Sequence, residues 1–381
     1  MVTTFIAGIG DSNCPTTWSG TPFHLLEAGR AAGIFDVGLD LSVERKTWTV
    51  RRALWNLSTC LRGRRYGGYQ YSTSFLERLY APVHERLRGN RIVNWFQLYP
   101  PSIVENPSID KWFYIDMTLR QLFERFGVCP AMDRRTIRCA LERELEGYHS
   151  ATAILTLSQW AARSVVEEYG ISPSRVHAII PGANISQPVY SRWADSSLYR
   201  DFKPGRPLKL VFAGKYWQRK GLDRLLEAFR IARASGADLS LRVIGVDRNT
   251  IPHGYRNLEA VEWLGFIDKR TNSEAFVKAI AECDVGCLLS RADASPIAVR
   301  EFAALGLITV CTDVGGASEM TVPDASVLVP LDASDETVSA ILVNLYKDRE
   351  GTERMLRRSS DLRRDALWES TVCKLQKHLQ R

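Results

Sequence analysis

The chain alternates between short apolar runs and longer stretches whose apolar residues recur at helical spacing. The apolar runs fall at 2–9, 37–41, 91–99, 111–115, 153–158 and 176–180 in the first half, and at 208–213, 239–246, 261–267, 284–289, 308–312 and 327–330 in the second. Strands that alternate with amphipathic helices are typical of open α/β sheets. The pattern therefore predicts an α/β protein with Rossmann-like order in both halves.

A polar segment punctuated by Pro188 and Pro204 interrupts this alternation. The 381 residues are enough for two domains of ordinary size. We therefore predict an N-terminal Rossmann-like domain at 1–187, a linker at 188–206 and a second Rossmann-like domain at 207–364.

The stretch 288–320 has the strongest chemical pattern of the chain. It runs from a strand into a loop with Asp293, then a helix with Glu301 near its start, a second strand and the turn Gly315-Gly316. A proline is tolerated at a helix start, where N–H groups lack intrahelical partners and the helix dipole is positive. The pattern predicts a phosphate site formed by Pro296 and the free N–H groups of Ile297, Ala298 and Val299. An ordinary βαβ unit with a capped helix is the alternative.

This stretch resembles the C-terminal signature of retaining glycosyltransferases of the GT-B fold, family 4. The resemblance lies in the pair of acids Asp293-x7-Glu301, the small-residue helix 302–306 and the 312–316 turn with its two glycines. The first acid of that pattern is usually Glu, so Asp293 keeps the charge with one methylene less. The resemblance implies that Asp293 accepts hydrogen bonds from the donor sugar and Glu301 from the ribose.

A second loop of the same half, 214–221, follows a strand and opens a helix. It resembles the family's Gly-Arg-x4-Lys-Gly phosphate clamp, with Gly214 at its start, Lys220 matching directly and Lys215 where Arg is usual. The resemblance implies that both lysines hold a diphosphate, although Lys lacks the fork geometry of Arg. Gly265, Phe266 and Ile267 resemble the segment whose backbone meets the nucleobase.

The family implies a GT-B fold, with two Rossmann-like domains facing across a cleft and a C-terminal helix, 365–381, crossing back to the first domain. It also implies transfer from a UDP- or GDP-linked sugar with retention at the anomeric carbon, and no separate cofactor. The chain contains no Asp-x-Asp triplet. We therefore expect no metal requirement, because two lysines and a helix start can supply the positive charge.

The first half offers weaker candidates. Gly20 and Thr21 lie in the loop after the first strand, which faces the donor phosphates and the acceptor in the family. Asp116 follows the strand 111–115, at the end of the strand where open α/β sheets place ligands. It is a candidate to face the acceptor, and capping of the helix 119–126 is the equally weighted alternative.

The segment 45–91 contains eleven Lys or Arg residues, two acids and many aromatic residues. Helices are predicted at 47–62 and 72–87. A solvated basic face over an aromatic core is the default interpretation. The alternatives are contact with an anionic membrane and binding of a polyanionic acceptor or nucleic acid, of which we regard nucleic acid as the less expected partner.

Charge and composition narrow the function classes only slightly. The net charge of +7 suits a phosphate-bearing ligand, a membrane surface or nucleic acid alike. Scattered cysteines and the absence of a signal-peptide pattern or an 18-residue apolar run predict a cytoplasmic protein, or one peripheral at the inner membrane face. The acceptor is predicted to be a glycan, a lipid-linked glycan or a small-molecule hydroxyl. A non-catalytic sugar-nucleotide or nucleic-acid binder and a nucleotide-sugar epimerase remain alternatives.

Overall fold

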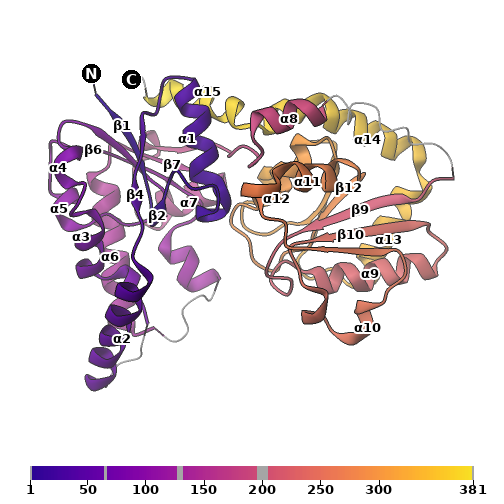
Figure 1. Cartoon of the computed structure of the whole chain (residues 1–381), viewed down its shortest axis with the longest axis horizontal. Helices are drawn as coiled ribbons and strands as arrows, with labels where there is room; N and C mark the ends of the chain where they lie inside the picture. Colours follow the sequence, from indigo (N-terminus) through magenta and orange to yellow (C-terminus); the bar gives the residue numbers. More distant parts are fainter. Residues whose placement is uncertain (1, 64–66, 127–131, 195–204, 380–381) are drawn as a thin grey trace. The chain divides into compact units, whose positions relative to one another are not determined.

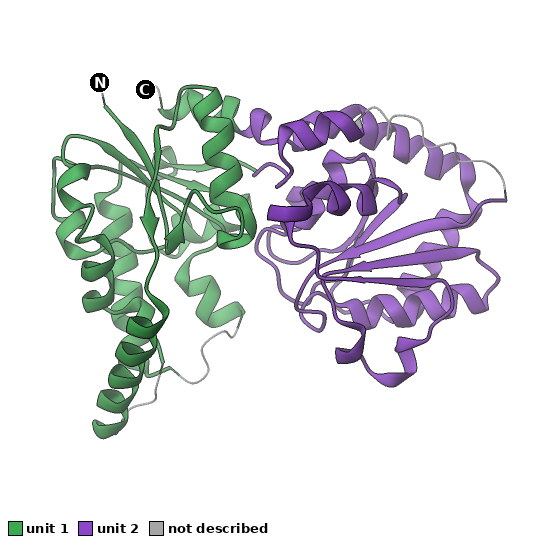
Figure 2. Cartoon of the chain, viewed as in Figure 1, with its two compact units in different colours: residues 1–180, 372–381 green, residues 181–371 purple. Residues whose placement is uncertain are grey.

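The computed structural model describes residues 2–63, 67–126, 132–194 and 205–379. The chain divides into two compact units, one formed by 1–180 with 372–381 and the other by 181–371 (Figure 2). Each unit is built on a six-stranded sheet in which all neighbouring strands run parallel. The alternating pattern of the sequence is thus confirmed in both halves.

The sheet of the first unit has the strand order β3-β1-β5-β6-β7-β8, and β2 and β4 form a separate two-stranded antiparallel sheet (Figure 1). The strands are β1 (Thr4–Ala7), β2 (Gly10–Asp11), β3 (Val37–Gly38), β4 (Asp40–Leu41), β5 (Arg91–Asn94), β6 (Asp110–Ile115), β7 (Ala153–Thr156) and β8 (Val176–Ala178). The α-helices are α1 (Thr21–Ala31), α2 (Arg45–Leu61), α3 (Thr73–Tyr80), α4 (His84–Leu87), α5 (Pro101–Val104), α6 (Arg134–Ser150) and α7 (Gln159–Glu167). Short turns complete it: η1 (Thr17–Gly20), η2 (Tyr69–Tyr71), the π-helical η3 (Gln121–Arg125) and η4 (Pro173–Arg175).

Aromatic side chains fill much of this core. Tyr99 lies 4.7 Å from Phe113 between ring centroids, and its hydroxyl donates to the carbonyl of Trp112 at 2.6 Å. Phe113 in turn meets Tyr148 of α6 edge to face at 5.1 Å. A buried tyrosine needs such a partner for its hydroxyl, so these bonds fix the packing as well as the burial.

Two predicted elements are shorter than their apolar patterns. The helix expected at 72–87 is divided into α3 and α4, because Pro82 lies between them and cannot donate the hydrogen bond of a continuous helix. The strand expected at 91–99 ends at Asn94, whose side chain accepts from Phe96 N at 3.1 Å and donates to Leu98 O at 2.9 Å. That side chain replaces the ladder partners and turns the buried aromatic segment away from the sheet.

The sheet of the second unit has the strand order β11-β10-β9-β12-β13-β14. The strands are β9 (Leu208–Ala213), β10 (Leu239–Ile244), β11 (Val261–Gly265), β12 (Val285–Leu288), β13 (Ile308–Thr312) and β14 (Ser326–Val329). The helices are α8 (Gln187–Ala194), α9 (Leu222–Ala234), α10 (His253–Arg256), α11 (Lys269–Ala281), α12 (Ile297–Ala304), α13 (Asp335–Lys347), α14 (Arg349–Leu362) and α15 (Trp368–Leu379), with the short turns η5 (Arg248–Thr250), η6 (Ser318–Met320) and η7 (Arg363–Ala366). In chain order this is the Rossmann arrangement, whose direction of winding reverses between β9 and β12.

The last helix begins in the second unit and ends in the first, as the fold prediction expects. Within the first unit, Arg91 donates to the carbonyl of Leu379 at 2.6 Å, and His177 stacks on His378 with ring centroids 4.2 Å apart. In the second unit, Trp368 donates to the Asn184 side chain at 3.0 Å. Among the described residues, no helix is both long and apolar enough to cross a bilayer.

Candidate functional site

The loops after β9 and β12 lie side by side at the reversal point of the second sheet. These two strands are neighbours and run parallel, so their carboxyl ends lie at the same edge. Loop 214–221 follows β9 and leads into α9, and loop 289–296 follows β12 and leads into α12. In open α/β sheets this is where ligands bind. The two loops that carry the predicted phosphate and acid motifs are therefore brought together by the topology.

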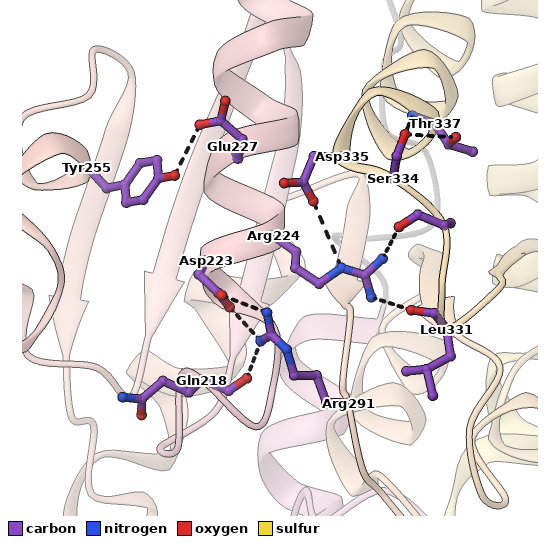
Figure 3. A network of polar contacts seen from close by, with 11 residues as sticks. Gln218, Asp223, Arg224, Glu227, Tyr255, Arg291, Leu331, Ser334, Asp335 and Thr337 are labelled. Atoms are coloured by element: carbon purple, nitrogen blue, oxygen red, sulfur yellow. Dashed lines mark hydrogen bonds and ion pairs between the residues drawn. The ribbon is translucent and has the colours of Figure 1, made fainter.

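Hydrogen bonds join these two loops into one piece. Arg291 N donates to Arg219 O at 2.8 Å, and the Arg219 side chain donates to Ala292 O at 2.7 Å. The Arg291 guanidinium donates to Gln218 O at 2.5 Å and forks onto the Asp223 carboxylate at 2.8 and 2.7 Å (Figure 3). Because the bonds run in both directions, neither loop can move without the other.

Helix α9 is in turn fixed to the segment leading into α13. Arg224 donates to the carbonyls of Leu331 and Ala333 at 3.2 and 2.6 Å, and lies 3.9 Å from the Asp335 carboxylate (Figure 3). These contacts hold the helix that follows loop 214–221, so the loop is anchored at its far end too.

Two glycines permit the close approach of backbone around loop 289–296. Gly221 has φ +68°, and a Cβ there would lie 1.8 Å from the carbonyl oxygen of Leu289. Gly315, in the turn after β13, has φ +60°, and a Cβ there would lie 2.0 Å from the carbonyl oxygen of Asp293. Any other residue would displace the loop and be strained at these φ values. The two-glycine turn seen in the sequence thus supports the acid loop.

Asp293 lies buried at the centre of the joined loops, with 7% of its surface exposed. Its Oδ2 contacts the Lys220 ammonium, accepts from Ser290 Oγ at 3.1 Å and lies 3.8 Å from the Arg219 guanidinium. Burial of a carboxylate without such partners costs free energy. The predicted clamp lysine and the predicted first acid are therefore direct neighbours.

Glu301 is the second buried acid, with 2% of its surface exposed. Its Oε1 contacts the ammonium of Lys269, the first residue of α11. Burial raises the pKa of the Glu301 carboxyl, and the positive charges of Lys269 and Lys220 oppose that rise. Lys269 was not among the predicted site residues. No spacing pattern links it to Glu301, 32 positions away, and only the tertiary fold brings the two side chains together.

The start of α12 lies between the two acids. Among the described residues, the N–H groups of Ile297 and Ala298 donate to no protein acceptor, as the prediction requires. The third predicted donor is wrong: Val299 N already donates to Pro296 O at 3.0 Å. The buried Ser295 hydroxyl also lacks a hydrogen-bond partner within the described part of the chain. Three polar groups are thus left for a ligand at a positively polarised helix start.

Lys215 and the predicted nucleobase segment form a separate contact. The Lys215 ammonium lies 4.5 Å from the centroid of the Phe266 ring, and 61% of Phe266 is exposed. Gly265 ends β11, and its carbonyl accepts from Gly245 N at 2.7 Å. Ile267 follows in the turn before α11. Lys215 therefore lies over an aromatic ring, whereas Lys220 is paired with an acid.

The candidates of the first unit lie after parallel strands of its own sheet. Gly20 ends η1 and is the N-cap of α1, and Thr21 is the first residue of α1; Trp18 and Ser19 just before them have φ of +49° and +62°. Asp116 directly follows β6. Nearby, Thr118 Oγ1 accepts from Gln121 N at 3.2 Å and caps the helical turn that follows.

Comparison with known proteins supports this description of the second unit. Residues 207–348 match the family model described as glycosyl transferases group 1. The matched part of the chain lies within the second unit. It contains Lys220, Asp293 and Glu301 together with all six strands of the second sheet. A sequence search of curated proteins finds no match.

Solved structures resemble the whole chain in fold. WaaG, a glycosyltransferase involved in lipopolysaccharide biosynthesis, has a TM-score of 0.64 at 14% identity, with 99% of both chains covered. HepE from Anabaena, in complex with UDP and glucose, has a TM-score of 0.63 at 13% identity over 99% of both chains. The apo structure of OtsA has a TM-score of 0.68 at 12% identity, covering 100% of this chain and 99% of the other. The chain has the GT-B fold.

Proposed function

We propose that the protein is a retaining glycosyltransferase that moves a sugar from a nucleotide-diphosphate sugar to a hydroxyl acceptor. One observation carries the proposal: two buried carboxylates, each in contact with a lysine, flank a helix start with unused donors at the sheet's reversal point. An anionic ligand with several hydroxyl groups matches this set of charges and donors.

The diphosphate would occupy the α12 start. Its oxygens would accept from Ile297 N, Ala298 N and the Ser295 hydroxyl, and would take the Lys220 ammonium from Asp293. Asp293, released from that ion pair, would accept from hydroxyls of the donor sugar. Positive charge held at this point stabilises the negative charge that develops on the leaving phosphate.

The remaining donor contacts follow from the same placement. Glu301 Oε2, the oxygen not in contact with Lys269, would accept from the ribose hydroxyls. The exposed Phe266 ring and the Gly265–Ile267 backbone would meet the nucleobase, with Lys215 moving from the ring toward the phosphates. UDP is the first nucleotide to test, because HepE is described in complex with UDP and glucose. GDP is the second.

Retention, independence of metal and the nature of the acceptor complete the proposal. The leaving phosphate would assist the deprotonation of the acceptor on the face from which it departs. The positive charges around α12 would serve in place of a metal ion. A glycan, lipid-linked glycan or small-molecule hydroxyl would be taken by the first unit, where Gly20, Thr21 and Asp116 follow strands of the parallel sheet.

The first test is a thermal-shift titration with UDP, GDP, ADP and their common sugar conjugates, with EDTA and with Mg²⁺. A ligand that binds only the folded protein raises the melting temperature by mass action. We expect one nucleotide to raise it in EDTA, and the Lys220→Ala variant to lose that shift. No shift with any nucleotide would overturn the donor-site assignment.

A turnover assay then separates the enzyme from a non-catalytic binder. The selected donor is incubated with an acceptor panel, and release of free nucleotide is followed together with the anomeric signal of the product by NMR. We expect a product with the donor's anomeric configuration. Binding without release of nucleotide across the panel would favour the binding protein, and conversion of the donor to another sugar would favour an epimerase.

A further inference from the structure

Helix α2 of the first unit exposes a continuous apolar stripe. Val50, Leu54, Leu57 and Leu61 are exposed by 58, 60, 55 and 79%. At 3.6 residues per turn these four positions fall within an arc of roughly 60°, so they form one line along the helix. Single exposed apolar residues are common on proteins, but four in one line form an apolar patch of the kind that marks an interaction site.

The opposite face of α2 already accounts for the packing of the helix. Trp48 lies 5.5 Å from Tyr69 and 5.2 Å from Phe75 between ring centroids. Trp55 lies 6.1 Å from Tyr69 and donates to the carbonyl of Gly67 at 2.9 Å. The leucine stripe is therefore not needed to hold α2 in the fold. Figure 1 shows the helix extending away from the sheet of its unit, and its C-terminal end carries Leu61.

The charges beside the stripe are all positive. Between its first and last residue α2 contains Arg45, Lys46, Arg51 and Arg52 and no acid, and Arg62 follows directly. None of these five takes part in an ion pair with another described residue. In helical projection Lys46 lies close to the stripe, and Arg51 and Arg62 lie on one flank of it.

We propose that α2 is a docking helix for an anionic lipid bilayer. The helix would lie in the plane of the interface, with its four apolar side chains among the acyl chains and its basic side chains at the lipid phosphates. Lys and Arg can reach the headgroups while their methylene stems stay with the apolar face. With four charged residues among its 17, α2 has the composition of a helix that lies on a membrane surface and not of one that spans the bilayer.

Charge complementarity favours lipid over a second copy of this chain. If two α2 stripes packed on each other, the unpaired basic side chains of both helices would face each other without an acid from either helix. Like charges at such an interface are repulsive. An anionic surface instead provides a counter-charge for Lys46, Arg51 and Arg62, which lie beside the stripe.

The test is flotation of the full chain, without any sugar donor, with vesicles of phosphatidylcholine alone or with 30% phosphatidylglycerol. We expect binding to the anionic vesicles that weakens as NaCl is raised from 50 to 500 mM. The variant with Val50, Leu54, Leu57 and Leu61 all changed to Ser should bind on the order of a hundredfold more weakly. The matched control changes Leu328 and Leu331 to Ser, which are 42 and 48% exposed in the other unit.

A charge variant separates the two contributions. Lys46→Gln with Arg62→Gln removes two exposed basic side chains beside the stripe while the stripe remains. We expect binding to fall about fivefold for each residue and its dependence on salt to become weaker. Binding that is equal on neutral and anionic vesicles would overturn the role given to the charges.

The exposed Cys60 of α2 allows the orientation to be tested directly. A protein that keeps Cys60 and the buried Cys283, Cys287 and Cys311, with Cys14, Cys129, Cys139 and Cys373 changed to Ser, is labelled at Cys60 with an environment-sensitive dye. The matched protein keeps the exposed Cys373 of α15 in place of Cys60. We expect a blue shift with anionic vesicles at Cys60 alone. Equal shifts at both sites, or at neither, would contradict docking by α2.

Other results would identify another occupant or none. If the four-Ser variant floats like the unchanged protein, the stripe is not a membrane surface and the proposal fails. If that substitution instead turns a dimer into a monomer by light scattering, the stripe is an interface between copies. Because no donor or acceptor is present, these outcomes do not depend on whether the protein transfers sugar.

Discussion

Each unit buries a glutamate, and the two are stabilised in different ways. Glu144 of α6 accepts from Leu119 N at 2.8 Å and from the Tyr148 hydroxyl at 2.7 Å, and Oε2 contacts the Tyr169 hydroxyl. All three donors are neutral, and burial raises the pKa of Glu144 to about 8. Glu301 of α12 instead contacts the Lys269 ammonium.

The difference separates a buried acid held by neutral donors from one that the proposed function places in the donor site. The neutral donors around Glu144 join α6, α7 and the segment after β6, and they use both of its oxygens. Glu301 lies beside a helix start with unused donors, in the segment that matches the model of the group 1 glycosyl transferases. The same residue type on similar parallel sheets is thus part of the core in one unit and part of the proposed donor site in the other.

Lys220→Ala is the strongest test of the second half of this comparison. Loss of the ammonium should lower transfer by about 10²–10³-fold, because one preorganised charge at the leaving group is removed. Steady-state kcat/KM is the measurement. Lys209→Ala is the matched control, since Lys209 is exposed at the opposite end of the same strand and should leave the rate unchanged. Equal losses in both variants would remove Lys220 from the site.

Lys269→Ala tests whether Glu301 depends on an ionic partner. The variant leaves a buried carboxylate without its ammonium, so we expect the free energy of unfolding to fall by about 3 kcal/mol in urea denaturation. The double variant Lys269→Met/Glu301→Gln should regain most of the lost free energy of unfolding, because it contains no unpaired buried charge. Donor binding should stay weak in the double variant. Full recovery of donor binding would show that Glu301 is structural, like Glu144.

Gly315→Ala tests the support of the acid loop. The new Cβ would meet the carbonyl of Asp293, so we expect stability to fall by about 2 kcal/mol more than in Gly236→Ala. Gly236 also has a positive φ, +85°, but a Cβ there meets no atom within 4 Å. Thermal melting gives the stability, and UDP-dependent shifts give the state of the loop. Equal destabilisation of the two variants would contradict the close approach.

Glu144→Gln tests the structural role of the acid in the first unit. The pKa of Glu144 is raised from the ordinary 4.5 to about 8 in the folded protein. Between these two pH values the folded state keeps a proton that the unfolded state has lost. Stability should therefore fall as pH rises from about 5 to about 8, by up to about 1.4 kcal/mol per pH unit. Glu144→Gln should remove this slope and leave donor binding unchanged.

Urea denaturation at pH 5, 7 and 9 measures how the free energy of unfolding depends on pH in the unchanged protein and in Glu144→Gln. Glu146→Gln is the control, since Glu146 is exposed on the same helix and should keep the slope of the unchanged protein. A Glu144→Gln variant that retained the slope, or that lost nucleotide binding, would break the contrast between the two acids.

The fold was accessible from the sequence because its signals are local. Apolar strands and glycine-ended helices are patterns of neighbouring residues, and they predicted two α/β domains that the structure confirms. Of the linker predicted at 188–206, residues 188–194 belong to α8, and 195–204 lie outside the described residues. The pair Asp293-x7-Glu301 and the loop of Lys220 were also readable, because each lies on one strand–loop–helix unit. Errors arose where a single side chain overrode a pattern, as Pro82 did between α3 and α4 and Asn94 did after β5.

Partners far apart in the chain came only from tertiary structure. Three features depend on which elements pack together: the contact of Lys269 with Glu301, the ion pair of Arg291 with Asp223, and the division of α2 into one exposed and one buried face. Sequence alone determined the parallel-sheet architecture and the residue types of the donor motifs, because backbone propensity and hydrophobic period act over a few residues. The tertiary structure decided which charges meet, because ion pairs form by distance in space and the winding of the sheet sets that distance.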